Sequence, residues 1–129
     1  MEKGLVLCDT NIIIEFYKEN PVVVKNLQGI GQQNIAVSIV TAGELLYGAL
    51  NKKELNQIKN DLEHLHVIHL KKETGERFTQ LMVDYTLSHR LSLPDGLIAA
   101  TALTEDLQLY THNLKDFRYI KGIGLYKEK

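Results

Sequence analysis

The chain has 129 residues, a length typical of one domain, and we expect a single domain over residues 1–129. Its apolar fraction of 44% and charged fraction of 24% are average for globular proteins, which excludes a disordered or fibrous chain. No apolar run approaches the roughly 18 residues that a membrane span needs, and no signal sequence is recognisable. We therefore expect a cytoplasmic protein that does not enter a membrane.

The formal charge of −1 gives the protein no overall positive field that would attract nucleic acid. Binding of RNA would then depend on local contacts with phosphates. A positively charged face that makes such contacts would be built from the basic residues Lys52, Lys53, Lys71, Lys72, Arg77, Arg90, Lys115, Arg118 and Lys121. The alternative is that these residues are scattered over a solvated surface.

In chain order, the first forty residues predict a strand, two helices and a second strand. The apolar segment Gly4–Cys8 is followed by a polar turn and by a second apolar segment, Ile12–Tyr17, which indicates a strand and then a helix. A short helix is expected over 22–30, since Asn-Pro precedes it. The β-branched segment Ile35–Val40 predicts the next strand.

The remaining chain continues this alternation. Apolar residues recur at helical spacing from Thr41 to Ala49. Further helices are expected over 55–65, 78–90 and 92–105, and further strands over Val67–Leu70, Leu107–Thr111 and Ile123–Tyr126. Strands that alternate with helices predict a parallel sheet covered by helices on both faces.

Three acidic residues, Asp9, Glu44 and Asp95, each follow closely on a predicted strand or begin a predicted helix. Because parallel strands have their carboxyl ends at one edge, these acids could converge there. The alternative for each acid is helix capping. Thr41 and Ser92 precede Glu44 and Asp95 at the spacing of a capping box.

Convergence of the three acids would require a cation. Two unit charges about 4 Å apart repel by roughly 4 kcal/mol at an effective dielectric constant of about 20, and no Lys or Arg is adjacent to these acids in sequence. Carboxylate oxygens favour Mg²⁺ or Mn²⁺ over zinc. A divalent ion held in this way is suited to hydrolysis of a phosphodiester.

Four sequence blocks occur in the order found in a known family: Leu7–Ile14, Val37–Gly48, Leu93–Ala102 and Tyr110–Phe117. Together they resemble the PIN-domain ribonucleases, and among these the VapC-like toxins of type II toxin–antitoxin systems. The resemblance implies a three-layer α/β/α sandwich with a central parallel sheet of four or five strands. It also implies an endoribonuclease that uses Mg²⁺ or Mn²⁺, forms a homodimer and binds a cognate antitoxin protein.

The resemblance assigns roles to individual residues. The acidic ligands of the family, which are its catalytic residues, match Asp9, Glu44 and Asp95. The polar residues that order the site match Thr10, Asn11 and Thr111. The chain departs from the family at Asn113, where an aspartate is common, and Asp116 one helical turn later is a candidate for an additional metal ligand.

Two alternatives to a toxin use the same residues. One is a PIN nuclease of RNA maturation or decay, and the other is a PIN-fold binding module that has lost catalysis. Histidines are further candidates for chemistry. His112 could meet a phosphate or leaving group, and the group of His64, His66 and His69 could bind a metal, although a solvated turn or surface is the simpler explanation of each.

Overall fold

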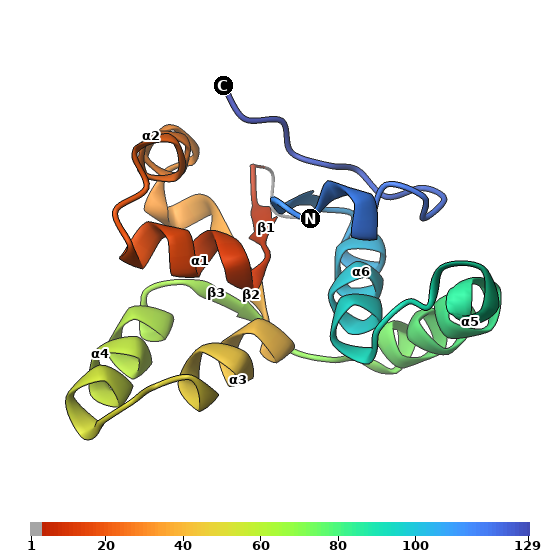
Figure 1. The fold of residues 1–129 in the computed structure, drawn as a ribbon, viewed down its shortest axis with the longest axis horizontal. Helices are drawn as coiled ribbons and strands as arrows, with labels where there is room; N and C mark the ends of the chain where they lie inside the picture. Colours follow the sequence, from red (N-terminus) through yellow and green to blue (C-terminus); the bar gives the residue numbers. More distant parts are fainter. Residues whose placement is uncertain (1–3) are drawn as a thin grey trace.

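The computed structural model describes residues 4–129, and its centre is a four-stranded parallel sheet (Figure 1). The strand order is β3-β2-β1-β4. The strands are β1 Val6–Cys8, β2 Ile35–Ser38, β3 His66–Ile68 and β4 Gln108–Tyr110. Every pair of neighbouring strands is parallel, so all carboxyl ends lie at one edge of the sheet.

Six α-helices and two 3-10 helices connect or follow the strands. The α-helices are α1 Thr10–Tyr17, α2 Pro21–Ile30, α3 Ile39–Tyr47, α4 Lys52–Glu63, α5 Lys72–His89 and α6 Leu93–Glu105. The 3-10 helices are η1 Gln32–Asn34 and η2 Leu114–Asp116. Each predicted helix is present. Among residues 4–129 no helix is both long and apolar enough to cross a membrane.

The two central strands, β1 and β2, are buried on both faces because their side chains alternate between two apolar cores. Val6 and Cys8 pack in one core with Ile12 of α1 and Val23 of α2. Leu7 points to the opposite face, into a core that contains Ile98 and other residues of α5 and α6. Figure 1 shows these two groups of helices on opposite sides of the sheet. The predicted three-layer α/β/α sandwich is confirmed.

The last predicted strand, Ile123–Tyr126, is reduced to one parallel bridge between Leu109 and Leu125. The chain beyond the bridge is held by side chains instead of a strand ladder. The Tyr126 hydroxyl and the Lys129 backbone N–H both donate to Oδ1 of the buried Asn26, at 2.7 and 2.9 Å. These bonds hold the C-terminal segment against α2.

Close packing of α5 against α6 fixes the position of the third acid. A Cβ atom at Gly96, the residue after Asp95, would lie 3.0 Å from the Phe78 ring and 3.1 Å from the sulfur of Met82. Phe78, Met82 and Tyr85 are partly buried and pack against the core. The apolar stripe along α5 is therefore a packing surface that supports the start of α6.

Candidate metal centre

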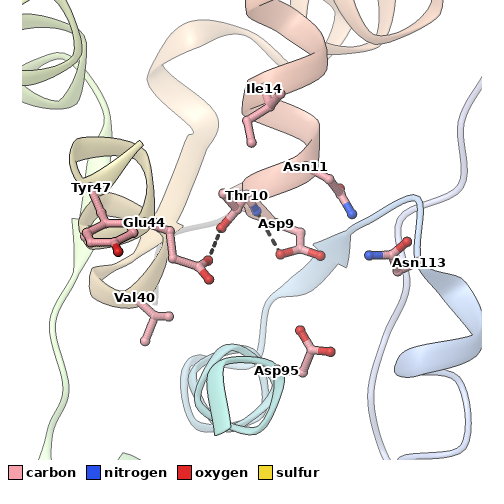
Figure 2. A pocket seen from close by; sticks show the side chains of 10 residues that line it. Asp9, Thr10, Asn11, Ile14, Val40, Glu44, Tyr47, Asp95 and Asn113 are labelled. Carbon is pink, nitrogen blue, oxygen red and sulfur yellow. Dashed lines mark hydrogen bonds between the residues drawn. The ribbon is translucent and has the colours of Figure 1, made fainter. Parts of the chain in front are cut away.

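The predicted acids converge at the carboxyl edge of the sheet. Asp9, Glu44 and Asp95 line one cavity of about 710 Å³, although they come from α1, α3 and α6 or the residues before them. Figure 2 shows the carboxylates of Asp9 and Asp95 facing each other across this cavity, with Glu44 on the flank. The other lining residues are Thr10, Asn11, Ile14, Val40, Gly43, Tyr47 and Asn113. None of the ten is basic.

Asp9 follows β1 directly and is only 5% exposed. It is the N-cap of α1: Oδ1 accepts a hydrogen bond from the Thr10 backbone N–H at 2.8 Å. Oδ2 accepts a bond from the Thr111 hydroxyl, also at 2.8 Å. Burial raises the pKa of Asp9, these two bonds lower it, and the charges of Glu44 and Asp116 raise it further. Asp9 thus caps a helix and faces the cavity at once.

Glu44 lies in the second turn of α3, so the hypothesis that it caps this helix is wrong. The helix begins at Ile39, inside the predicted strand, because Ser38 is its N-cap and accepts a bond from the Thr41 backbone N–H at 3.1 Å. The Glu44 carboxylate instead accepts a hydrogen bond from the Thr10 hydroxyl at 2.6 Å. This contact joins α3 to α1 at the cavity.

Thr41 supports the Thr10–Glu44 contact, a role that the sequence analysis did not assign to it. The hydroxyl oxygens of Thr10 and Thr41 lie 3.0 Å apart. Because a hydroxyl has one proton and Thr10 gives its proton to Glu44, Thr41 is the donor in this pair. Thr41 is fully buried. The signal that could have revealed it is its polar side chain on the apolar face of a helix.

Asp95 occupies the third position of α6 and presents its carboxylate to the cavity. Its backbone N–H donates to Oγ of the N-cap Ser92 at 3.2 Å. Among the hydrogen bonds of residues 4–129, no reciprocal bond joins the Asp95 carboxylate to the Ser92 backbone, so the capping box is half formed. Burial, followed by the charges of Asp9 and Asp116, raises the pKa of Asp95 to about 6.

The fourth sequence block lies beside the acids. Asn113 lines the cavity, and its backbone N–H donates to Oγ1 of Thr111 at 3.0 Å. Asp116 ends η2 and does not line the cavity. Its charge nevertheless contributes to the raised pKa values of both Asp9 and Asp95. We call Asp9, Glu44 and Asp95 the acidic cluster. Asp116 adds its charge to this cluster from a position close to Asn113, where the family commonly has an aspartate.

The acidic cluster has no basic partner within residues 4–129. The ion pairs found there join Lys18 to Glu15, Lys71 to Glu105 and His112 to Glu128. In the same residues no three His, Cys, Asp or Glu side chains are arranged to hold one ion between them. The donor set around the cavity is nevertheless all oxygen, negatively charged and open. It fits a hard ion such as Mg²⁺, which keeps several of its waters and takes few carboxylates.

Three of the four histidine candidates, His64, His66 and His112, make contacts away from the acids. Nε2 of His112 lies 2.7 Å from Oε2 of Glu128, and the buried Tyr110 hydroxyl donates to the same oxygen at 2.6 Å. His64 and His66 contact backbone carbonyls, of Asn60 and Gln33. His112 is therefore a link between β4 and the C-terminal segment, which the sequence analysis missed because Glu128 carries no local signal.

Comparison with known proteins identifies the family. The family model of the PIN domain matches residues 6–123. Ribonuclease VapC2 of Rickettsia felis is 30% identical over 128 residues, which cover 94% of this chain and 96% of that protein. Ribonuclease VapC1 of Methanocaldococcus jannaschii is 28% identical over 127 residues, which cover 96% of this chain and 87% of that protein.

Comparison with solved structures points to the same family. One chain of a toxin-antitoxin complex from Klebsiella pneumoniae matches with a TM-score of 0.79 and 31% identity, over 96% of this chain and 99% of that chain. The chain belongs to the PIN-domain family and, within that family, to the VapC ribonucleases.

The raised pKa of Asp95 predicts a pH-dependent gain of stability in Asp95→Asn. The folded protein binds this proton more tightly than the unfolded chain, so ionisation of Asp95 destabilises the metal-free fold as pH rises from about 4 to about 6. At pH 7.5 in EDTA the variant should be more stable than the parent by on the order of 1 kcal/mol after screening by solvent, and it should therefore unfold at a higher temperature. At pH 4 the gain should disappear. Thermal unfolding of parent and variant at the two pH values measures the gain at pH 7.5 and its loss at pH 4.

The matched control for this prediction is Asp84→Asn, since Asp84 is an exposed aspartate of α5 outside the cavity. It should show no gain at pH 7.5. A gain in Asp95→Asn of the same size at both pH values would contradict an electrostatic cause and indicate better helix capping.

Proposed function

We propose that this chain is a divalent-metal-dependent endoribonuclease that acts on cytoplasmic RNA as the toxin of a VapBC-type toxin–antitoxin pair. Asp9, Glu44 and Asp95 would hold Mg²⁺ or Mn²⁺, with Asp116 as a further ligand from η2. The observation that carries the proposal is the convergence of carboxylates from separate elements on one cavity without a basic partner. The VapC ribonucleases among the relatives support RNA as the substrate.

The residues of the site have distinct tasks in this proposal. When bound, the ion would lower the pKa of a coordinated water and offset the charge that develops on the phosphodiester. Asp9 is held rigidly by its bonds from Thr10 and Thr111, and Glu44 is oriented by Thr10. Asn11 and Asn113 supply neutral polar groups at the rim of the cavity, where a phosphate oxygen would not be repelled.

We expect Asp9→Asn, Glu44→Gln and Asp95→Asn each to reduce cleavage of RNA by about 10²-fold or more at saturating Mg²⁺, because each removes a negative ligand. Unfolding temperatures should hold or rise, since amides cap helices nearly as well as acids and repulsion in the cluster decreases. Cleavage by the parent protein should require Mg²⁺ or Mn²⁺, stop in EDTA and survive a zinc-selective chelator.

Asp84→Asn is the control for these variants, and Asp116→Asn should give a partial loss. Full activity in all three variants of Asp9, Glu44 and Asp95 would overturn the nuclease centre. That result would favour a PIN-fold binding module without catalysis.

A second element of the proposal is a homodimer. Large apolar side chains are strongly exposed on α3 and the loop after it, on α5 and at the start of α6, and both α3 and α5 pack against α6. The exposed fractions are 93% for Tyr47, 86% for Leu50, 72% for Val83, 91% for Leu87 and 62% for Leu93. An apolar surface of this kind favours burial against a second copy of the chain.

We expect Leu87→Lys to convert the dimer to a monomer, because it places a charge in the apolar contact. Light scattering at micromolar concentration measures the mass of parent and variant. Leu55→Lys, at a 41% exposed position of α4, is the matched control and should stay dimeric. A parent protein that is monomeric throughout this range would contradict the dimer.

The antitoxin would occupy a groove next to the acids. A cavity of about 1120 Å³ lies between α1, α2 and α4, lined by apolar residues such as Phe16 and Leu65 and by polar ones such as Lys25 and Asp61. α1 lines both cavities, with Ile14 in the wall of the acidic cavity and Ile13 in the wall of the groove. A peptide seated in the groove could therefore cross α1 and cover the acidic cluster. The similar chain in the Klebsiella pneumoniae toxin-antitoxin complex supports such a partner.

We expect Phe16→Lys to cleave RNA normally and to escape inhibition by the protein encoded immediately upstream of this chain. Phe16 is 43% exposed, so the change should not unfold the protein. Growth during co-expression and inhibition of cleavage by the purified upstream protein measure the effect. If expression without that protein is harmless while RNA is still cleaved, the chain is a nuclease of RNA maturation or decay.

A further inference from the structure

Three aromatic side chains outside the acidic cavity form a compact stack. The rings of His89 and Tyr119 lie parallel, with centroids 3.8 Å apart and planes at 5°. Tyr85 meets both of them edge-on, at 5.1 Å from Tyr119 and 5.9 Å from His89. We call His89 and Tyr119, with Tyr85 beneath them, the aromatic shelf.

The shelf is held in place by hydrogen bonds. The Lys121 backbone N–H donates to the Tyr85 hydroxyl at 3.1 Å, which ties the segment after η2 to α5. Oγ of Ser88 lies 2.7 Å from Nδ1 of His89 and orients that ring. His89 is exposed at the end of α5, and Tyr119 is half-buried. A rigid ring with one exposed face loses little conformational entropy when a ligand stacks on it.

The shelf adjoins the acidic cluster. Burial raises the pKa of the Tyr119 hydroxyl, and the charges of Asp95 and Asp116 raise it further, so both carboxylates lie near this side chain. Asp116 is also only three residues before Tyr119 on the same segment. A chain-like ligand whose phosphate lies among the acids would reach the shelf within a short distance.

The charged residues next to the shelf in the sequence are positive. Arg90, Arg118 and Lys121 are exposed and lie within two residues of His89 or Tyr119. No Asp or Glu lies within two residues of either ring in the sequence. The protein as a whole has a formal charge of −1, so this is a local positive surface next to an acidic one. Positive side chains that flank exposed aromatic rings are the features that bind single-stranded nucleic acid.

We propose that the aromatic shelf is a binding subsite for an unpaired nucleobase of the RNA substrate, which stacks on the exposed ring of His89, itself backed by Tyr119, while Arg90, Arg118 and Lys121 contact the adjoining phosphates. The proposal rests on the ribonuclease function proposed above. It requires a single-stranded segment, because a base inside an A-form helix is stacked on both faces and is not available. The shelf would thus direct cleavage to loops or unpaired ends.

The test uses the full chain in EDTA and a short single-stranded RNA that carries 2-aminopurine, whose fluorescence is quenched by stacking. Binding without metal separates recognition from cleavage. Stacking of a base contributes about 1–3 kcal/mol, so we expect His89→Ala and Tyr119→Ala each to weaken binding by about 10-fold and to abolish the quenching. Tyr119→Phe keeps the ring and should bind as the parent does.

Further variants separate base from phosphate contacts. Arg118→Gln should weaken binding by only about 2–3-fold, and it should reduce the dependence of binding on salt by roughly one ion. Phe16→Ala is the control, because Phe16 is an exposed aromatic that lines the other groove. With Mg²⁺ present, His89→Ala should raise KM about 10-fold and leave kcat unchanged.

Two results would overturn the shelf: parent protein that binds this RNA without quenching, or alanine variants that bind and quench as the parent does. His89 is exposed, so loss of folding does not obscure its variant, and the unfolding temperature verifies this. The cleavage assays on Asp9, Glu44 and Asp95 are independent of the shelf. Failure of the subsite with intact metal-dependent cleavage would leave the nuclease proposal standing.

Discussion

Repulsion among carboxylates at the carboxyl edge of the sheet is the constraint to which the rest of the site responds. Asp9 is almost fully buried there, and the charges of Glu44 and Asp116 add to the cost of its ionisation. Two hydrogen bonds to its carboxylate oppose that cost. Without a cation the cluster is destabilising at neutral pH, and the apolar cores on the two faces of the sheet have to compensate. A bound divalent ion would remove this penalty.

The acids are held from several directions, and this explains how a charged cluster can persist. Asp9 caps the start of α1, Glu44 lies in the second turn of α3, and Asp95 lies in the first turn of α6. The close contact of Gly96 with α5 anchors the start of α6. On the other side, Thr111 connects β4 to Asp9 across 102 residues of sequence. Because each acid is fixed by a different element, repulsion cannot be relieved by the movement of one loop.

Helix capping and a functional site are compatible explanations of the same acids, although they compete in the sequence. Asp9 is a true N-cap and still presents its carboxylate to the cavity. Asp95 lies in a half-formed capping box, and only Ser92 contributes a side-chain bond to it. Glu44 has no capping role, because Ser38 begins the helix one turn earlier. A local motif therefore identifies the residue type that a helix start prefers, and does not reveal where the side chain points.

The amino-acid sequence by itself determined the order of strands and helices, the parallel sheet and the three acids, because hydrophobic periodicity and motif spacing are local properties of the chain. It also showed the departure at Asn113. Only the tertiary structure decided the contacts that join distant segments: Thr10 with Glu44, the approach of Asp116 to the acids, and the stacking of His89 on Tyr119. It likewise reduced the last strand to a bridge and joined the end of the chain to the buried Asn26. Such contacts depend on how helices pack across the sheet, and no local pattern encodes that geometry.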